Sequence, residues 1–152
     1  MRTSSPTDVL DLIGAEAAGE SPLWAEALRS DPSRDLVFGA LVPERFALGV
    51  ETIYEGYLVH YGCARLFAPP DADVALLLGD YLYAHGLVRV AATGDLDAVA
   101  ALADLISACA ALRAEAEEGD GRAWLAAVAR LGGAPGPDDV AGALAAHAER
   151  VG

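Results

Sequence analysis

Lysine is absent from this sequence of 152 residues, and all ten of its basic residues are arginine. They are outnumbered by 23 acidic residues, which gives a formal net charge of −13 at pH 7. Proteins that bind nucleic acid or the anionic surface of a membrane need clustered cations to contact phosphate groups. The charge balance therefore argues against both kinds of partner.

Cysteine is nearly absent as well. Cys63 and Cys109 lie in apolar segments, and their spacing is unlike that of a metal site. Free cysteine is among the most buried residue types, so we predict two buried thiols. This cysteine usage is typical of a cytoplasmic protein.

The chain shows neither a signal segment nor an unbroken apolar run. Acidic residues occupy the place of a signal's apolar core, at Asp8, Asp11 and Glu16. Ionisable side chains interrupt the longest apolar stretch, residues 74–92, at Asp80, His85 and Arg89. We therefore predict neither a secretory signal nor a transmembrane segment.

Signals for β-strands are almost missing, whereas Ala, Leu, Glu and Arg recur at helical spacing. The pattern predicts helices at about residues 8–18, 22–30, 43–68, 71–92, 96–118, 121–131 and 138–150. Ser21 is expected to cap the second helix, and Thr93 or Asp95 the fifth. Because the breaks between the long helices are short, we predict an all-α antiparallel helical bundle that forms a single domain over residues 1–152.

Two central helices are apolar on almost every side. Apolar positions go nearly all the way round residues 74–91, and only Asp104 and Ser107 interrupt them in residues 98–112. Hydrophobic residues make up 54% of the chain, and its mean hydropathy is +0.32. A helix that is apolar all round must be enclosed all round, which a bundle of this size rarely achieves alone. We therefore expect a second chain to cover part of these helices.

Two consecutive segments carry a family resemblance. They are VETIYEGYLVHYGCARLF, residues 50–67, and LLLGDYLYAHGLVRVAATGD, residues 76–95. Together they resemble the trans-polyprenyl diphosphate synthase family, whose first motif helix reads A-x-E-L-I-H-x-x-x-L-I-H-D-D-x-x-D. Glu51 falls on the glutamate of that pattern, and His60 falls on its second histidine. The resemblance covers about residues 40–117 and implies a truncated, isoprenoid-synthase-like bundle.

The sequence differs from the family at the positions that bind metal ions in the family's catalytic members. There, three aspartates hold the Mg²⁺ ions that grip the diphosphate leaving group, and Mg²⁺ needs such oxygen ligands. The corresponding positions here are Tyr61, Gly62 and Arg65. The basic segment that follows in the family is missing, and so is the second aspartate motif. The resemblance thus implies no catalytic residue and no cofactor in this chain, with Mg²⁺ expected in a catalytic partner.

The family includes two-component hexaprenyl and heptaprenyl diphosphate synthases, in which a short subunit without aspartate motifs pairs with a catalytic subunit. This chain resembles such a small subunit in length and in its losses. The implied function, in isoprenoid biosynthesis, is to bind and stabilise the catalytic subunit as a heterodimer and to shape product chain length. Alone, the chain is expected to form a homodimer.

The family's dimer contacts imply an interface on residues 71–91 and 95–117, the same helices that are apolar all round. The expected interface residues are Leu78, Asp80, Tyr81, Leu82, Tyr83, Leu87, Leu102, Leu105 and Ile106. A charge placed at Ala101 or Leu105 should dissociate the assembly if the position lies at the contact. It should unfold the chain if the position lies in the core.

Metal binding and aromatic anchoring are further interpretations of these helices. His60, Cys63 and His85 are metal-ligand types, but a zinc site needs four ligands and no fourth is evident. Buried or interfacial histidines are the simpler interpretation. Five tyrosines are expected to form one cluster on two neighbouring helices, as core packing or as interface anchors. They are Tyr54, Tyr57, Tyr61, Tyr81 and Tyr83.

Two other functions remain open from the sequence. Asp71, Asp73 and Asp80 could be relocated carboxylates of a stand-alone, Mg²⁺-dependent prenyl-diphosphate enzyme. Helix-start roles explain the first two, and Asp80 is expected to be a satisfied buried or interfacial polar group. The chain could also be a homodimeric helical protein that retained the fold without the activity.

Overall fold

The computed structural model describes residues 6–151, which form seven α-helices and one short 3₁₀ helix and contain no strand. The elements are α1 (Pro6–Glu20), α2 (Pro22–Ala27), η1 (Gly39–Leu41), α3 (Glu44–Tyr61), α4 (Ala72–Ala91), α5 (Leu96–Ala114), α6 (Asp120–Arg130) and α7 (Pro137–Val151). The predicted all-α helical bundle is confirmed.

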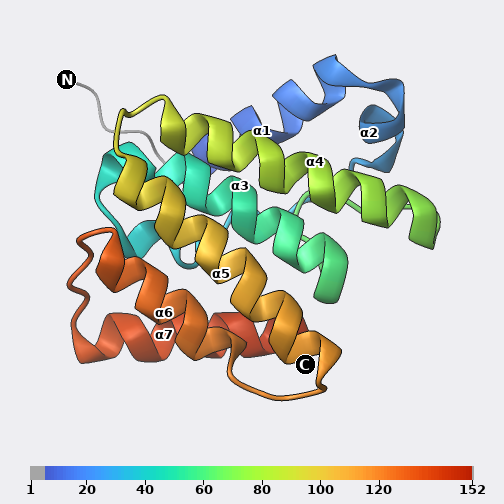
Figure 1. Cartoon of the computed structure of the whole chain (residues 1–152). Coiled ribbons are helices and arrows are strands. Elements are labelled where there is room, and N and C mark those ends of the chain that lie inside the picture. The colour runs from blue at the N-terminus through green and yellow to red at the C-terminus, as the bar shows by residue number, and fades with distance from the viewer. Residues whose placement is uncertain (1–5, 152) are drawn as a thin grey trace.

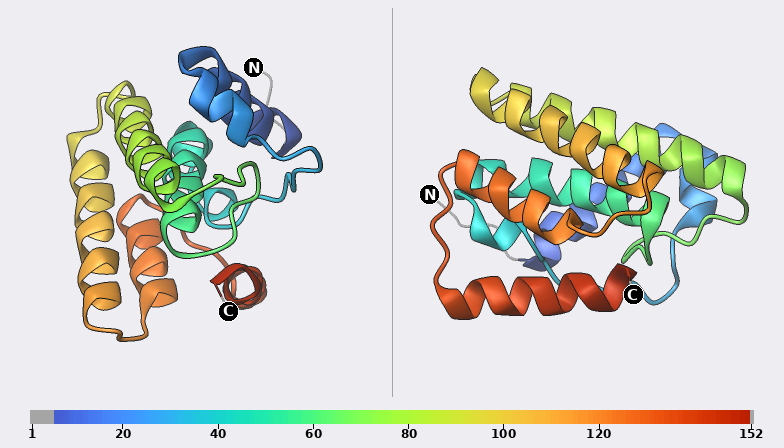
Figure 2. Two further views of the ribbon diagram at one scale, coloured as in Figure 1. Left: turned by 90° about the vertical axis from the view of Figure 1, so that its right-hand side faces the viewer. Right: turned by 60° about the horizontal axis from the view of Figure 1, so that its bottom comes forward.

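Helix α3 lies at the centre of the bundle (Figure 1). Every residue from Gly49 to Leu58 is buried, because other helices cover α3 from several sides. Helices α4 and α5 form a layer on one side of it, and α6 lies beside α5 (Figure 2). Helix α7 runs across the bottom of the bundle, and α1 packs against α3 on the side away from α5 (Figures 1 and 2).

Three helices begin at polar side chains that cap them. The side-chain oxygens of Ser21, Asp71 and Asp95 each accept a main-chain N–H of the first turn, at 3.1, 2.9 and 2.9 Å. These bonds satisfy N–H groups that have no partner within the helix. The predicted cap at Ser21 is confirmed, and Asp95 rather than Thr93 caps α5.

Helix α3 ends at Tyr61, whereas the sequence predicted a helix to about residue 68. Gly62 takes an extended conformation with φ −145° and ψ −150°. The next N–H, from Cys63, donates to the main-chain oxygen of Arg150 in α7 at 2.8 Å. Cys63 therefore lies outside the helix and is exposed, so the prediction of two buried thiols is wrong for Cys63 and is confirmed for Cys109.

The segment after α3 also fixes the end of α2. Phe67 and Leu28 form an isolated antiparallel bridge, and the N–H of Ala68 donates to the main-chain oxygen of Ala27 at 2.7 Å. These bonds stop α2 at Ala27 rather than near residue 30. Tertiary contacts thus override the local helical preference of both segments.

Helices α3 and α4 approach each other closely because glycines face each other at two points. A Cβ atom built on Gly56 would lie 3.0 Å from the main-chain oxygen of Gly79, and one on Gly86 would lie 3.0 Å from that of Gly49. In each helix the two glycines stand about two turns apart, and hence on one face. This paired spacing is a sequence signal for close helix packing that apolar periodicity does not reveal.

Candidate functional site

The three positions that carry aspartates in the resembling family lie at and beyond the end of α3. Tyr61 is the last residue of the helix, Gly62 follows it, and Arg65 lies in the connecting segment. The side chain of Arg65 turns back against α3 and is buried. The three positions therefore share no helix face.

Arg65 is held by two buried glutamates that stand one turn apart on α3. Its guanidinium donates to one oxygen of Glu51 and, from Nε at 3.1 Å, to one oxygen of Glu55. All three side chains are 0% exposed. Burial opposes the charge on Arg65, but the two carboxylates more than offset this effect and raise its pKa.

Main-chain N–H groups complete this buried network. The second oxygen of Glu51 accepts from Val37 and Gly39 at 2.9 and 2.6 Å, and that of Glu55 accepts from Leu66 at 2.8 Å. Two carboxylates and one guanidinium leave one uncompensated negative charge, which these N–H dipoles stabilise. The network ties the segments before and after α3 to the middle of that helix.

This arrangement does not fit a Mg²⁺ site. A phenol, a glycine and a guanidinium stand where carboxylates would be needed, and both nearby carboxylates already bind protein donors. Across the described residues, no group of three or more His, Cys, Asp or Glu side chains is placed to hold a metal ion. His60 pairs with Asp80 at 3.2 Å and His85 with Glu16 at 3.1 Å, so the two histidines serve separate contacts.

The predicted interface residues divide between core and surface. Four leucines are at most 4% exposed and pack inside the chain's own core, which corrects their predicted place at an interface: Leu78, Leu82, Leu102 and Leu105. A helix that is apolar all round gives no sequence signal for which leucines face inward. Asp80 is exposed, which excludes the buried alternative for it and leaves the interfacial one as a prediction, whereas four residues are half-buried: Tyr81, Tyr83, Leu87 and Ile106.

The outward sides of α4 and α5 nevertheless carry many apolar residues. We define the outer face by its exposed members: Leu76, Leu77, Ala84 and Val88 of α4, and Leu96, Ala100 and Ala103 of α5. Its four largest side chains, Leu76, Leu77, Val88 and Leu96, are 56%, 55%, 64% and 76% exposed.

Within the described chain, α4 alone is long and apolar enough to cross a membrane by length and composition, and 28% of its apolar window is buried. Those two criteria do not separate a membrane span from a helix that binds a partner chain.

Four of the five tyrosines gather between α3 and α4, and Tyr81 lies apart from them. Tyr54, Tyr57 and Tyr61 follow one another along α3, with successive ring centroids 5.9 and 5.2 Å apart. Tyr81 packs against a tryptophan of α2 at 5.7 Å, and Tyr83 packs against a histidine of α3 at 5.0 Å. Tyr83 also lies close enough to Tyr57 and Tyr61 for their charges to act on it, whereas Tyr81 faces α2. The predicted cluster is therefore confirmed for four tyrosines and wrong for Tyr81.

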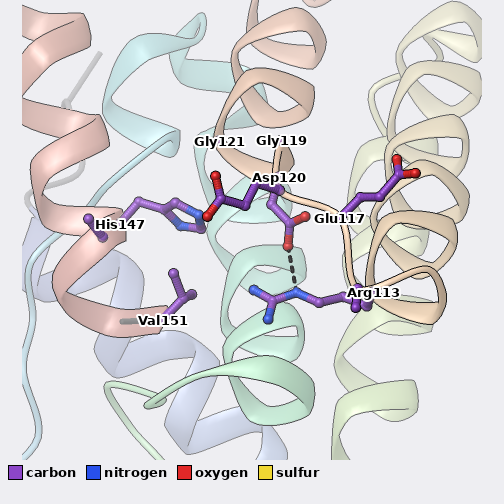
Figure 3. Close-up of a pocket in the computed structure, with 10 residues that line it drawn as sticks. Arg113, Glu117, Gly119, Asp120, Gly121, His147 and Val151 are labelled. Atoms are coloured by element: carbon purple, nitrogen blue, oxygen red, sulfur yellow. Dashed lines mark hydrogen bonds and ion pairs between the residues drawn. The ribbon is translucent and has the colours of Figure 1, made fainter.

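A pocket of about 720 Å³ opens where the end of α5, the start of α6 and the end of α7 meet (Figure 3). Beneath it, the buried hydroxyl of Tyr57 donates to Asp120 Oδ2. Arg113 donates to the same oxygen from Nε and to the Tyr57 hydroxyl from Nη2, both at 2.8 Å. Burial and the bond to Asp120 raise the pKa of Tyr57, so this phenol keeps its proton at neutral pH.

His147 of α7 lines the same pocket, and its Nδ1 lies 2.9 Å from the hydroxyl of Tyr54. Tyr54 is fully buried, and within the described residues its hydroxyl has no other hydrogen-bond partner. We assign the hydroxyl proton to the bond with Nδ1, which gives the buried hydroxyl its one acceptor, and the neutral imidazole then carries its own proton on Nε2. Burial lowers the pKa of His147, Arg113 lowers it further, and Asp120 opposes both, so the ring is neutral at pH 7.

Sequence periodicity gave no signal for this pocket, because its residues come from α5, α6 and α7 and bond to α3 across 56 to 93 positions of the chain. Comparisons with protein-family models, curated proteins and solved structures find no match to this chain. Function is therefore inferred from the geometry of the chain together with the resemblance of its central segments.

Proposed function

We propose that this protein is the non-catalytic small subunit of a hetero-oligomeric polyprenyl diphosphate synthase. It binds the catalytic subunit through the outer face of α4 and α5. In this role it covers apolar helices of its partner, stabilises them and shapes the cavity in which the prenyl chain grows. The binding role rests on the geometry of the outer face, and the identity of the partner rests on the sequence resemblance.

The observation that carries the proposal is the outer face. Four large apolar side chains on it are more than half exposed: Leu76, Leu77, Val88 and Leu96. Exposed apolar surface of this kind marks interaction sites on soluble proteins. A stable interface of an obligate complex buries on the order of 2,000 Å² or more in total, which two helices of this length can supply in part.

The negative charge of the chain indicates which kind of partner surface would fit the outer face. The chain has a net charge of −13, and Asp73 and Asp80 are exposed on α4. A fitting partner presents apolar helices with arginine or lysine beside them. This complementarity disfavours close association of two copies of the chain relative to association with a less acidic subunit.

The buried network supports the non-catalytic part of the proposal. Arg65 occupies the third aspartate position of the resembling motif, and Glu51 and Glu55 enclose its charge. Mg²⁺ would have to displace a paired guanidinium from a site with no exposure to water. Transition-state stabilisation by metal ions is therefore assigned to the partner.

Prenyl transfer assays test the proposal. The chain, a full-length synthase from the same genome with both aspartate motifs, and their mixture are each given Mg²⁺, an allylic diphosphate and isopentenyl diphosphate. We expect no product from the chain alone, and a higher rate or another product length from the mixture than from the synthase alone. Product from the chain alone, surviving removal of contaminating synthase, contradicts the proposal.

Two matched variants test whether the effect on the synthase depends on the outer face. Ala84→Arg places a charge on the outer face, whereas Ala141→Arg places the same charge on an exposed position of α7. The first should abolish the effect on the synthase and the second should leave it unchanged. If the chain instead binds lipid vesicles, and Ala84→Arg prevents this, the outer face belongs against a bilayer.

Self-association is the alternative that the same face favours. A stable homodimer with no effect on any synthase would assign the chain to the proteins that retained a helical fold without the activity. Relocated carboxylates have no such support, because Asp71 caps α4 and Asp80 contacts His60.

A further inference from the structure

The pocket between α5, α6 and α7 takes no part in the proposed subunit contact, because none of the residues that line it belongs to the outer face. Its volume of about 720 Å³ falls within the range of roughly 300–1,000 Å³ that is typical of small-molecule sites. Polar groups anchored to the core converge on it. Size and convergent polar groups together indicate a binding site for a small polar molecule.

The inner end of the pocket presents hydrogen-bond donors. His147 is 6% exposed, and its Nε2–H, set by the bond from Tyr54, has no acceptor among the described residues. Arg113 uses Nε and Nη2 for Asp120 and Tyr57, which leaves Nη1 without a bond to the described part of the chain. In Figure 3, Arg113 and His147 approach the pocket from opposite sides. A ligand that fits this end must offer an oxygen acceptor.

The outer end of the pocket is acidic. Arg113 and Asp120 neutralise each other, and His147 is neutral, so the inner end carries no net charge. Glu117 and Glu118, from the turn before α6, are exposed and also line the pocket. Their carboxylates repel a simple anion such as phosphate and attract a cation. The two ends therefore call for an acceptor oxygen and a positive charge within one small molecule.

We propose that this pocket binds a small zwitterion of the amino-acid type. The ligand's carboxylate accepts from His147 Nε2–H and Arg113 at the inner end, and its ammonium lies near Glu118 at the rim. No side chain caps α6, so the N–H groups of its first turn remain as additional donors at the carboxylate end. The proposal is independent of the subunit function, since it uses neither the outer face nor the Arg65 network.

Isothermal titration calorimetry tests the ligand class. Glycine, β-alanine and 4-aminobutyrate separate ammonium from carboxylate by increasing distances, and acetate and ethylammonium are the matched half-ligands. We expect at least one zwitterion to bind in a saturable, one-to-one manner, and more tightly than either half. The proposal is overturned if no zwitterion binds, or if acetate or ethylammonium binds equally tightly.

Variants on the same elements test the location. Ala148 is exposed and lines the pocket, whereas Ala145 is exposed on α7 and does not. Ala148→Phe should therefore abolish binding and Ala145→Phe should not. Glu118→Gln should weaken binding about two- to fivefold, as for one exposed charge pair, whereas Glu115→Gln, outside the pocket, should have no effect.

Nitrogen NMR of His147 supplies a readout that does not depend on affinity. In the free protein the imidazole should carry its proton on Nε2, and the Nε2 resonance should shift as the zwitterion is added. An Nε2 resonance that does not move at saturation, or binding that persists in Ala148→Phe, would place the ligand elsewhere and refute the site.

Discussion

Arg65 ties the segment after α3 to the middle of that helix. The chain has no carboxylates at the motif positions, and the Arg65 guanidinium bonds two glutamates of α3, Glu51 and Glu55. Both glutamates also accept main-chain N–H groups, so every buried charge has partners. The network specifies the paths of two connecting segments.

Removing the guanidinium is expected to destabilise the fold. Arg65→Ala leaves two carboxylates unpaired in the core, and loss of one partner of a buried ion pair costs about 3–5 kcal/mol. Urea denaturation measures this change. Arg34→Ala, which breaks an exposed pair with Asp11, serves as the control and should cost less than about 1 kcal/mol. Equal stability of the two variants would mean that the network does not hold the fold together.

Protonation of His147 is expected to lower stability in acid. Burial holds the pKa of His147 below its ordinary value of 6.5, so the unfolded chain binds this proton more readily than the folded chain. The stability that depends on the neutral ring is complete above pH 6.5 and is lost as the pH falls toward the lowered folded pKa. Denaturation at about pH 7.5 and about pH 5.5 measures the loss, and His147→Gln should remove this part of the pH dependence. An NMR titration giving His147 an ordinary or raised pKa would contradict the prediction.

Among the helices, the pair α3 and α4 makes the closest contact. Two glycines on each helix let the backbones approach. A Cβ on Gly49, Gly79 or Gly86 would clash with a side chain of the other helix, and one on Gly56 or Gly86 would lie 3.0 Å from a main-chain oxygen. Backbone atoms cannot move aside as a flexible side chain can. The contact therefore depends on glycine at these positions more than on apolar character.

Substituting one of these glycines is expected to separate the two helices. A Cβ on Gly86 would meet the Ile53 side chain and lie 3.0 Å from the main-chain oxygen of Gly49. Overpacking of this kind costs about 1–3 kcal/mol, so Gly86→Ala should lower the free energy of unfolding. Gly142→Ala, in an exposed part of α7 with no atom within 4 Å, should instead stabilise the chain by up to about 1 kcal/mol through helix propensity. Thermal denaturation distinguishes the two, and a stabilising Gly86→Ala would refute the close contact.

Some helix ends could be predicted from the sequence and others could not, because local bonds fix some ends and contacts with distant segments fix others. Helix starts were predictable, since Ser21 and Asp95 cap through local bonds. The end of α3 was not, because bonds to α7 and to the segment after α2 determine it. The pocket could not be predicted from the sequence either, because its residues are brought together by the fold. His147 and Tyr54, which form a hydrogen bond there, are 93 positions apart in the chain.

Substitutions on the inward side of α5 are expected to affect the folding of the whole molecule, whereas substitutions on its outward side are not. Ala101 and Leu105 are 1% and 4% exposed, so neither lies on the surface. Ala101→Arg is therefore expected to unfold the chain rather than dissociate an assembly, because it buries an unpaired charge. Circular dichroism measures the loss of helix. Ala100→Arg, on the exposed side of the same helix, should remain folded, and a folded Ala101→Arg would show that the core is open at this point.

The outer face is the surface through which we propose that the molecule associates. The unmodified chain should self-associate at micromolar concentration when alone, because its exposed leucines and valine then have no other cover. Addition of the catalytic subunit should replace this species with a heteromeric complex. The variant Ala84→Arg/Val88→Arg should keep its helical content, since both positions are exposed.

Light scattering after size-exclusion chromatography of the chain mixed with the full-length synthase from the same genome tests this account most directly. The unmodified chain and Ala141→Arg should co-elute with the synthase at the mass of a defined complex, and Ala84→Arg/Val88→Arg should elute separately from it. A chain that stays monomeric both alone and in the mixture, or a double variant that binds as well as the unmodified chain, would contradict the account.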